Sequence, residues 1–398
     1  MKILIRSIFF FMLVLLASVA CGSAPATPAP TLPAASPSAF ANAPASPAAP
    51  VHPTATPSTS PAAVPTATPS PAPPTAAPSP TRAPALVQLT SGGCCVQPFW
   101  SRDSKRVLFI DKPNAQSPTG IYSVNVDAPG EPQLVSEEVA NSNQNGTFSV
   151  GFEGTTTVVT RAADGAKWLI DNGRRGVMIS PEGKQVAWNV TPQTYPFENR
   201  VTTVMLGALA EPAQGQPLRI TPTRVTTVTR GGASAWLDEG HLLVTGRLTA
   251  GSEVVTLFVL DLATKSTRNV ASSERLRSVS VSPGGRYIVY TIVFDKDPAQ
   301  SGGWLVPADG SGPAAKLPFF GAFQWRDESR IVYVPLDVGA PSHQFREYDA
   351  ASDADRPLTD PAALAFMIGN GDWAVSPDGQ KVVFVSAKDW NLWLVDLP

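Results

Sequence analysis

Apolar and polar residues alternate in a short phrase that recurs along the chain from residue 99 onward. Each copy has an apolar or aromatic residue, a polar turn such as Ser-Pro-Asp-Gly, a basic or polar residue, and then an alternating apolar run. The clearest copies are residues 99–109, 177–188, 279–290, 323–333 and 373–384. Strict alternation is the period of a half-buried strand, and a recurring phrase is typical of a repeat architecture. The pattern therefore predicts an all-β chain built from repeated hairpins.

The turn in each copy has a physical explanation. Proline presets φ at the second turn position, aspartate bonds back to nearby backbone amides, and glycine accepts a positive φ. Further apolar strands follow the hairpins, as in residues 120–126, 256–262 and 391–397. Each copy therefore predicts a four-stranded sheet, and the series of sheets predicts the blades of a β-propeller.

The number of blades follows from the number of copies. Two weaker copies, residues 148–159 and 233–244, lie between the clear ones. The anchoring apolar residues are then Trp100, Phe152, Ile179, Trp236, Val281, Trp325 and Val375. These anchors predict seven blades. The interval from Phe152 to Ile179 is short for four strands, so six blades with an irregular insertion is the alternative.

The last copy is followed by only one further strand, residues 391–397. Residues 86–90, Leu-Val-Gln-Leu-Thr, precede the first copy and have the character of a strand. We expect this N-terminal strand to complete the last blade. A ring closed in this way leaves no loose sheet edge, and the propeller then spans residues 86–398.

The first 20 residues have the order of a secretory signal peptide: basic Lys2 and Arg6, an apolar run over residues 8–16, and then small residues. The run is too short for a stable membrane span, which needs roughly 20 residues. The four residues ending at Cys21 resemble the lipidation site of bacterial lipoproteins. This resemblance implies a lipid anchor at Cys21 and a place on the extracytoplasmic face of a bacterial cell membrane. The alternative is an ordinary signal peptide in which Cys21 has no role.

Residues 21–85 have the composition of a disordered tether. They hold 19 of the 41 prolines, mixed with Ala, Ser and Thr, and contain no Asp, Glu or Lys. Such a segment buries too little apolar surface to offset its ordering entropy. Proline keeps it extended, so it would hold a domain away from a membrane surface.

The charge balance argues against nucleic acid as a partner. Only three of the 30 basic residues precede residue 86, which leaves 27 basic against 32 acidic side chains in the predicted propeller. Nucleic-acid binding requires a basic patch or stripe. We expect a monomeric protein whose contact with the membrane is its lipid anchor.

Cysteine is rare, and apart from Cys21 the chain has only the adjacent pair Cys94 and Cys95. In an exported protein the two thiols can oxidise. The sequence predicts a disulfide between these neighbours, which would form a flat contact plate or a redox switch. The alternatives are a strained surface turn or two reduced thiols at a blade edge.

No motif for catalysis or metal binding stands out. Residues 232–236, Gly-Ala-Ser-Ala-Trp, lack the second glycine of a nucleophile elbow. The three histidines, His52, His241 and His343, are far apart in sequence, and the acidic residues 349–355 lack the glycine and distal glutamate of an EF-hand. We therefore expect no catalytic residues, no cofactor and no metal.

The repeated phrases Trp-Ser-x-Asp-Ser-Lys and Ser-Pro-Asp-Gly-x-x-Val-x-Phe resemble the repeats of TolB-like propellers, also called WD40-like. Related propellers precede the catalytic domain of prolyl oligopeptidase and dipeptidyl peptidase enzymes. The resemblance spans nearly all of residues 86–398 and implies the fold. We expect the hydrolase domain of these peptidase relatives to be missing from this chain.

These features predict a non-catalytic propeller lipoprotein that binds a protein, peptide or glycan through loops at one face of the ring. The loops longer than a hairpin needs surround Cys94 and Cys95 and cover residues 111–119, 191–200 and 295–303, and long loops commonly carry function. The alternative is a propeller hydrolase or lactonase with acidic or histidine side chains pointing into the central channel.

Overall fold

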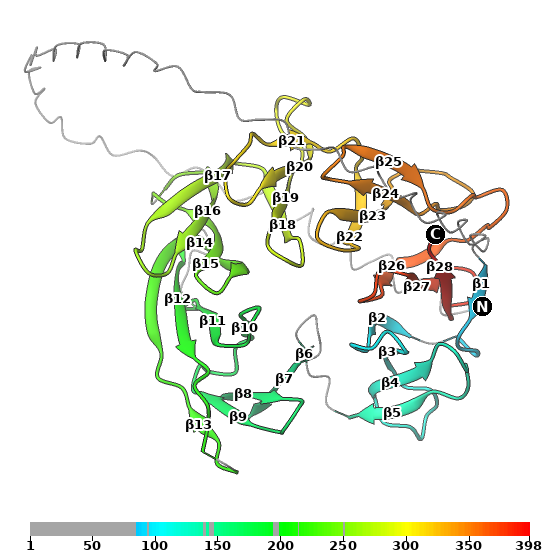
Figure 1. Cartoon of the computed structure of the whole chain (residues 1–398), viewed down its shortest axis with the longest axis horizontal. Coiled ribbons are helices and arrows are strands. Elements are labelled where there is room, and N and C mark those ends of the chain that lie inside the picture. The colour runs from blue at the N-terminus through cyan, green and yellow to red at the C-terminus, as the bar shows by residue number, and fades with distance from the viewer. Residues whose placement is uncertain are drawn as a thin grey trace, which may run out of the picture. The chain divides into compact units, whose positions relative to one another are not determined.

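The computed structural model describes residues 85–93, 95–137, 141–142, 147–193, 199–213, 215–249 and 251–398. All the described residues belong to one compact unit of the chain. In that unit the strands form sheets placed one after another around a ring (Figure 1). The predicted all-β propeller is confirmed.

Three of the sheets consist of four antiparallel strands paired in chain order, as the phrase predicts. Their strands are β2 (Val96–Trp100), β3 (Arg106–Asp111), β4 (Gly120–Asn125) and β5 (Gln133–Ser136); β18 (Leu276–Val281), β19 (Tyr287–Ile292), β20 (Gly302–Pro307) and β21 (Ala315–Lys316); β22 (Gly321–Trp325), β23 (Arg330–Pro335), β24 (Arg346–Asp349) and β25 (Ala354–Pro357). The first strand of each lies nearest the ring centre (Figure 1).

The sheet that follows β5 has five strands in the order β13-β9-β8-β7-β6. They are β6 (Asn141–Ser142), β7 (Phe148–Glu153), β8 (Thr156–Arg161), β9 (Lys167–Ile170) and β13 (Leu218–Arg219). The weak copy at residues 148–159 thus covers the second and third strands of its sheet, β7 and β8. The prediction that Phe152 lies in an inner strand was therefore wrong, because Phe152 lies in the second strand, β7. The interval to Ile179 is short because it begins one strand later than the other intervals.

Seven strands share one sheet in the order β10-β11-β12-β14-β15-β16-β17. They are β10 (Met178–Ile179), β11 (Gln185–Val190), β12 (Val201–Ala208), β14 (Thr223–Asp238), β15 (His241–Arg247), β16 (Val255–Asp261) and β17 (Thr267–Ser273). The first half of β14 pairs with β12 and its second half with β15. Two four-stranded repeats therefore share one long strand, and the described strands form six sheets. The predicted count of seven separate blades is not confirmed.

A bend in β14 lets it serve both repeats. Arg230 has a positive φ of 53°, and the pairing shifts between Thr229 and Gly232. A Cβ at Gly231 would lie 1.9 Å from the backbone oxygen of Thr245. Only glycine lets the chain pass this close to β15, so the backbone bends without a separate loop.

The predicted closure by an N-terminal strand is confirmed. The last sheet has the order β1-β28-β27-β26, with β1 (Leu86–Gln88), β26 (Ile368–Val375), β27 (Lys381–Ser386) and β28 (Leu392–Asp396). Leu86 pairs with Val395, and the backbone amide of Leu89 donates to the Leu392 oxygen at 2.8 Å. The two ends of the propeller thus meet in one sheet, and β1 covers the edge of β28.

The serine of the repeated turn has a structural role. The hydroxyl oxygens of Ser180, Ser282 and Ser376 each accept the backbone amide five residues later, at 2.9–3.0 Å. The turn glycines Gly183 and Gly379 have φ near +70°, as the phrase predicts. These contacts fix the hairpin between the first and second strands, so the polar phrase serves the fold.

Tryptophans at the ends of inner strands connect successive repeats. The indole N–H of Trp100 donates to the Ala374 oxygen, and that of Trp236 donates to the Met178 oxygen, each at 3.0 Å. Trp325 makes the same type of bond to Ser280 Oγ. Each bond joins one inner strand to the inner strand of a neighbouring repeat.

The core lies between neighbouring repeats. Six clusters of buried apolar side chains each lie between one repeat and the next. Followed in chain order, they run from the β6–β9 sheet through the last sheet to the β2–β5 sheet. The cluster beside the closing strand includes Leu89 and Cys95 together with side chains from both ends of the chain. Packing of one sheet face against the next therefore gives the ring its main stabilisation.

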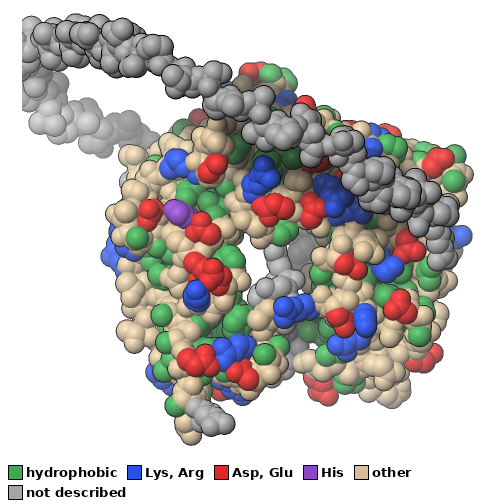
Figure 2. Space-filling model, viewed as in Figure 1, with side chains coloured by type: hydrophobic (Ala, Val, Ile, Leu, Met, Phe, Trp, Pro, Cys, Tyr) green, Lys and Arg blue, Asp and Glu red, His purple; other side chains and the backbone are tan. Residues whose placement is uncertain are grey.

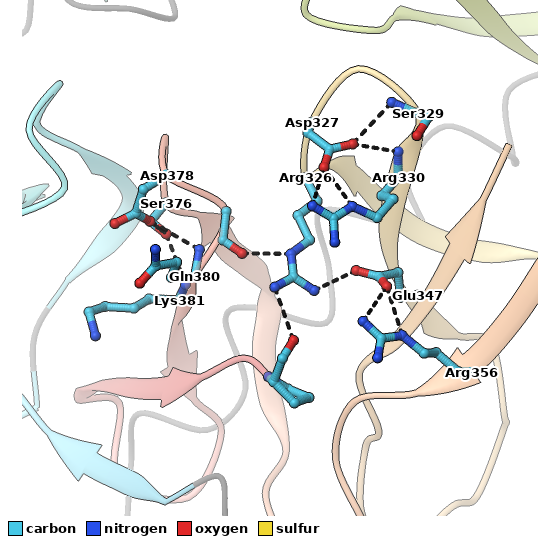
Figure 3. Close-up of polar contacts among 12 residues, drawn as sticks. Arg326, Asp327, Ser329, Arg330, Glu347, Arg356, Ser376, Asp378, Gln380 and Lys381 are labelled. Atoms are coloured by element: carbon cyan, nitrogen blue, oxygen red, sulfur yellow. Dashed lines mark hydrogen bonds and ion pairs between the residues drawn. The ribbon is translucent and has the colours of Figure 1, made fainter. Parts of the chain in front are cut away.

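A charged network joins two repeats near Pro398 (Figure 3). Arg326 forms an ion pair with Glu347, and their side chains are only 7% and 4% exposed. Arg326 Nε also donates to the Gly379 oxygen at 2.6 Å, and its Nη2 donates to the Pro398 oxygen at 3.1 Å. Arg356 forms an ion pair with the other carboxylate oxygen of Glu347, with Nη2 2.7 Å from Oε1. This network connects the β22–β25 sheet to the β26–β28 sheet.

Candidate functional site

The loops singled out from the sequence lie on one face of the ring. Antiparallel strands alternate in direction, so connections after a second strand and before a first strand lie at the same end of each sheet. Residues 111–119, 191–193 and 295–303 follow the second strands β3, β11 and β19, and residues 194–198 of the predicted loop 191–200 lie outside the described residues. The segment before β2 contains Cys95. We call this end of the ring the loop face and the opposite end the hairpin face.

Exposed apolar side chains concentrate on the loop face. Among the described residues, twelve large apolar side chains are exposed. Nine of them belong to loops or strand ends on this face: Val96, Val201, Leu248, Val254, Phe294, Phe320, Leu336, Val338 and Trp390. Phe294 and Val338 are 89% and 90% exposed. Scattered single apolar residues are normal, but this bias toward one face is typical of a contact surface.

A pocket of about 420 Å³ lies where three inner strands begin. It is lined by β18, β22 and β26, with Phe320, Phe323 and Trp373 among its apolar residues. Gln324 holds β22 against β26 through two hydrogen bonds. Its Nε2 donates to the Trp373 oxygen, and its Oε1 accepts the Val375 amide. The pocket walls are therefore fixed to one another by hydrogen bonds as well as by packing.

Arg277 supplies the positive charge of this pocket. Its Nη1 donates to the Leu276 oxygen at 2.9 Å, and within the described part of the chain its guanidinium makes no ion pair. The side chain is exposed. Apolar and aromatic walls with one free cation suit a ligand that combines an apolar group with a carboxylate.

The inner strands are irregular at their loop-face ends. The pairing register shifts near the start of β2, β18 and β26. Gln97 and Asn370 have positive φ values of 53° and 55°. Bulges of this kind redirect side chains and are frequent next to functional sites. The pattern of apolar and polar residues does not predict these bulges, because they depend on pairing between strands.

The structure describes only one of the two cysteines before β2. Cys94 lies outside the described residues, so the Cys94–Cys95 disulfide stays a prediction. The Cys95 side chain is buried in the core beside the closing strand, and its Sγ lies 3.8 Å from Thr90 Oγ1. Gly93 N donates to Asn391 Oδ1 at 3.0 Å, which fastens this segment to β28. Cys21 also lies outside the described residues.

The described histidines lie apart from the pocket. His241 Nδ1 is 2.8 Å from Asp238 Oδ1 at the β14–β15 turn, on the hairpin face. His343 accepts the Ile368 amide at Nδ1, at 3.1 Å. Burial lowers the pKa of His343, and a neutral ring fits its role as acceptor. His52 lies outside the described residues.

The carboxylates of the acidic turn at residues 349–355 form hydrogen bonds and an ion pair with residues close to them in the sequence. Asp349 Oδ1 accepts the Ala351 amide at 2.9 Å, and Asp353 accepts the hydroxyl of Tyr348 at 2.8 Å. Asp355 forms an ion pair with Arg346. Within the described residues, no group of three or more His, Cys, Asp or Glu side chains is arranged to hold a metal ion.

Charge is mixed on the face shown in Figure 2. Acidic and basic side chains lie next to one another around a central opening, without a continuous area of one sign.

No helix in the described part of the chain is long and apolar enough to span a membrane.

The sequence matches no protein-family model and no curated protein. Similar folds occur among solved structures. An oligogalacturonate lyase in complex with manganese has a TM-score of 0.54 at 13% identity, covering 79% of this chain and 93% of that one. The oligogalacturonate lyase from Vibrio parahaemolyticus has a TM-score of 0.53 at 10% identity, covering 79% and 93%. A structure of prolyl endopeptidases has a TM-score of 0.50 at 13% identity, covering 77% of this chain and 47% of that one.

These similarities show a shared fold. The chain is a β-propeller, as the repeated phrases predicted. The same architecture accompanies a lyase in one relative and belongs to a peptidase in another, so the role of this chain has to be argued from its own residues.

Proposed function

We propose that this protein is a non-catalytic binding propeller that captures a protein, peptide or glycan on its loop face. The concentration of exposed apolar side chains on that face carries the proposal. The pocket around Arg277, at the start of three inner strands, is where we expect the partner's apolar and acidic groups to dock. Propeller blades hold such a surface rigid, which reduces the entropy cost of binding.

The alternative of a hydrolase or lactonase needs acidic or histidine groups converging in the channel. Among the described inner strands, only Asp238 in β14 and Asp372 in β26 carry carboxylates, and they belong to different sheets. Asp238 already bonds His241. These positions favour a binding role over an enzyme.

The binding role is testable by photo-crosslinking in cells that carry the full-length protein. We expect a photoreactive residue at Phe294 or Val338 to form adducts with one shared partner, because both side chains protrude from the loop face. Arg277→Glu should reduce those adducts at least tenfold by placing a carboxylate where the partner's acidic group docks.

The control positions are Thr264 and Gln380, which are exposed in turns of the hairpin face. A photoreactive residue at either should give no adduct with the shared partner. Equal adducts from both faces, or unchanged adducts in the Arg277→Glu variant, would refute binding at the loop face.

We further propose that a lipid at Cys21 anchors this propeller to the extracytoplasmic face of a bacterial cell membrane, with residues 22–85 as its tether. The basic, apolar and small residues before Cys21 support this. Cys21→Ser should move the protein from the membrane fraction to the soluble fraction while leaving the size of the folded domain unchanged. Retention of the variant in the membrane fraction after a high-salt wash would contradict the anchor.

A further inference from the structure

Among the described residues, one interface of the ring has no cluster of buried apolar side chains. The six clusters of buried apolar side chains leave out the interface between the β2–β5 sheet and the β6–β9 sheet. In the described residues this interface instead encloses a cleft of about 910 Å³. That volume lies within the range of roughly 300–1,000 Å³ typical of ligand sites.

The cleft walls are apolar sheet faces. Leu108 and Ile121 project from one sheet, and Val158 projects from the other. Phe99, which pairs with Leu108, adds aromatic surface. All of these backbones are paired within their own sheets, so a ligand would meet side chains rather than free backbone groups.

Three cations gather at the hairpin-face end of this cleft. Arg102 lies in the β2–β3 turn, Arg106 is the first residue of β3, and Lys167 is the first residue of β9. All three are exposed, and none makes an ion pair with another described residue.

The acidic residues of the lining offset only part of the charge of these cations. Asp103 is occupied within its own turn, where it accepts the Ser101 hydroxyl at 2.6 Å and the Lys105 amide at 3.1 Å. These bonds lower the pKa of Asp103. Glu153 is the other carboxylate of the lining. The cleft therefore combines an apolar interior with an excess of positive charge at one end.

We propose that this cleft binds a peptide segment of a partner protein in which carboxylates flank apolar side chains. The carboxylates would pair with Arg102, Arg106 and Lys167, and the apolar side chains would cover the sheet faces. Aliphatic walls such as Leu108 and Val158 match apolar side chains better than they match the hydroxyl groups of a sugar. The chain's own residues 22–85 contain no Asp or Glu, so they lack the complementary charge.

The test uses isothermal titration calorimetry on the full-length protein with three synthetic hexapeptides. The first alternates glutamate with leucine, phenylalanine and valine; the second replaces glutamate by lysine; the third replaces the apolar residues by glycine. We expect only the first to bind, with an affinity that falls as salt rises because the contact is partly ionic. Binding of the lysine peptide with equal affinity, or no binding of the first peptide, overturns the proposal.

Two charge-reversal variants locate the binding. R102E/R106E should lower the affinity for the first peptide at least tenfold. K296E/K388E makes the same change in net charge on exposed lysines of the loop face, and it should change that affinity less than twofold. Both pairs are at the surface, and circular dichroism confirms the fold of each variant. Equal weakening by both variants overturns the assignment to this cleft.

The apolar part of the cleft and the class of ligand need their own measurements. Val135→Asp alters a lining residue that is 49% exposed, and it should lower the affinity for the first peptide at least fivefold. Oligogalacturonate is the rival probe, and tighter binding of it with the same dependence on Arg102 and Arg106 would overturn the peptide in favour of an acidic glycan. The loop-face crosslinks at Val338 should be unaffected by R102E/R106E, which separates this site from the proposed function.

Discussion

Replacing Glu347 by glutamine should lower the free energy of unfolding by about 3–5 kcal/mol. The substitution removes the charge that compensates Arg326, whose guanidinium is buried between two sheets (Figure 3). Removing one member of a buried pair leaves the other as an isolated charge, and the desolvation cost of that charge is then no longer offset. Because Arg326 also holds the backbone oxygens of Gly379 and Pro398, the loss should spread to the last sheet.

Urea unfolding, followed by tryptophan fluorescence, measures this effect. The double variant Arg326→Met with Glu347→Met should lose less stability than the sum of the single variants, because it leaves no unpaired charge. The matched control is Glu182→Gln, which removes an exposed pair with Lys184 whose side chains are 59% and 71% exposed. The control should keep its unfolding midpoint, as exposed pairs contribute little. An E347Q midpoint equal to that of the wild type would show that the pair does not stabilise the ring.

Replacing Leu89 by alanine should cost about 2–5 kcal/mol. Leu89 is 3% exposed and packs in the cluster that contains residues from both ends of the propeller. Its backbone amide bonds Leu392, and Thr90 Oγ1 accepts the Leu392 amide at 2.9 Å. Losing the side chain leaves a cavity beside the closing strand, so the strand should detach more often from β28.

Hydrogen exchange measured by mass spectrometry reports this detachment directly. Amides of residues 86–90 and 392–396 should exchange faster in Leu89→Ala than in the wild type, while those of β18 to β25 should change little. Val87→Ala is the control, since Val87 is 37% exposed on the same strand and its replacement should alter stability by less than about 0.5 kcal/mol. Uniformly faster exchange around the ring would contradict a local role for the closing strand.

The two sites differ in how the ring creates them. The pocket around Arg277 forms where inner strands of three sheets begin, and it depends on the curvature of the ring. The cleft beside Arg102 lies at the interface where the described residues form no core cluster. Both place cations next to apolar surface, but at opposite faces. Binding at one is therefore expected to leave the other accessible.

Most of the fold was predictable from the sequence because its physical causes are local. Alternation of apolar residues marks the strands, and the serine, proline and glycine of the turns at residues 180–183, 282–285 and 376–379 act within six residues of one another. Closure by residues 86–90 was also predictable, since the last copy lacks a strand and this segment can supply it. The prediction failed at Phe152, because β6 has only two residues and shows no alternation that a sequence pattern can detect.

The sequence by itself determined the all-β repeat, the turns and the closing strand, because each depends on neighbouring residues or on a count of copies. Only the tertiary structure decided that β14 serves two repeats, that Cys95 is buried beside Leu89, and that Arg277 borders a pocket. These features arise from contacts between segments far apart in the chain. Such contacts depend on the path of the backbone around the ring, which no local pattern specifies.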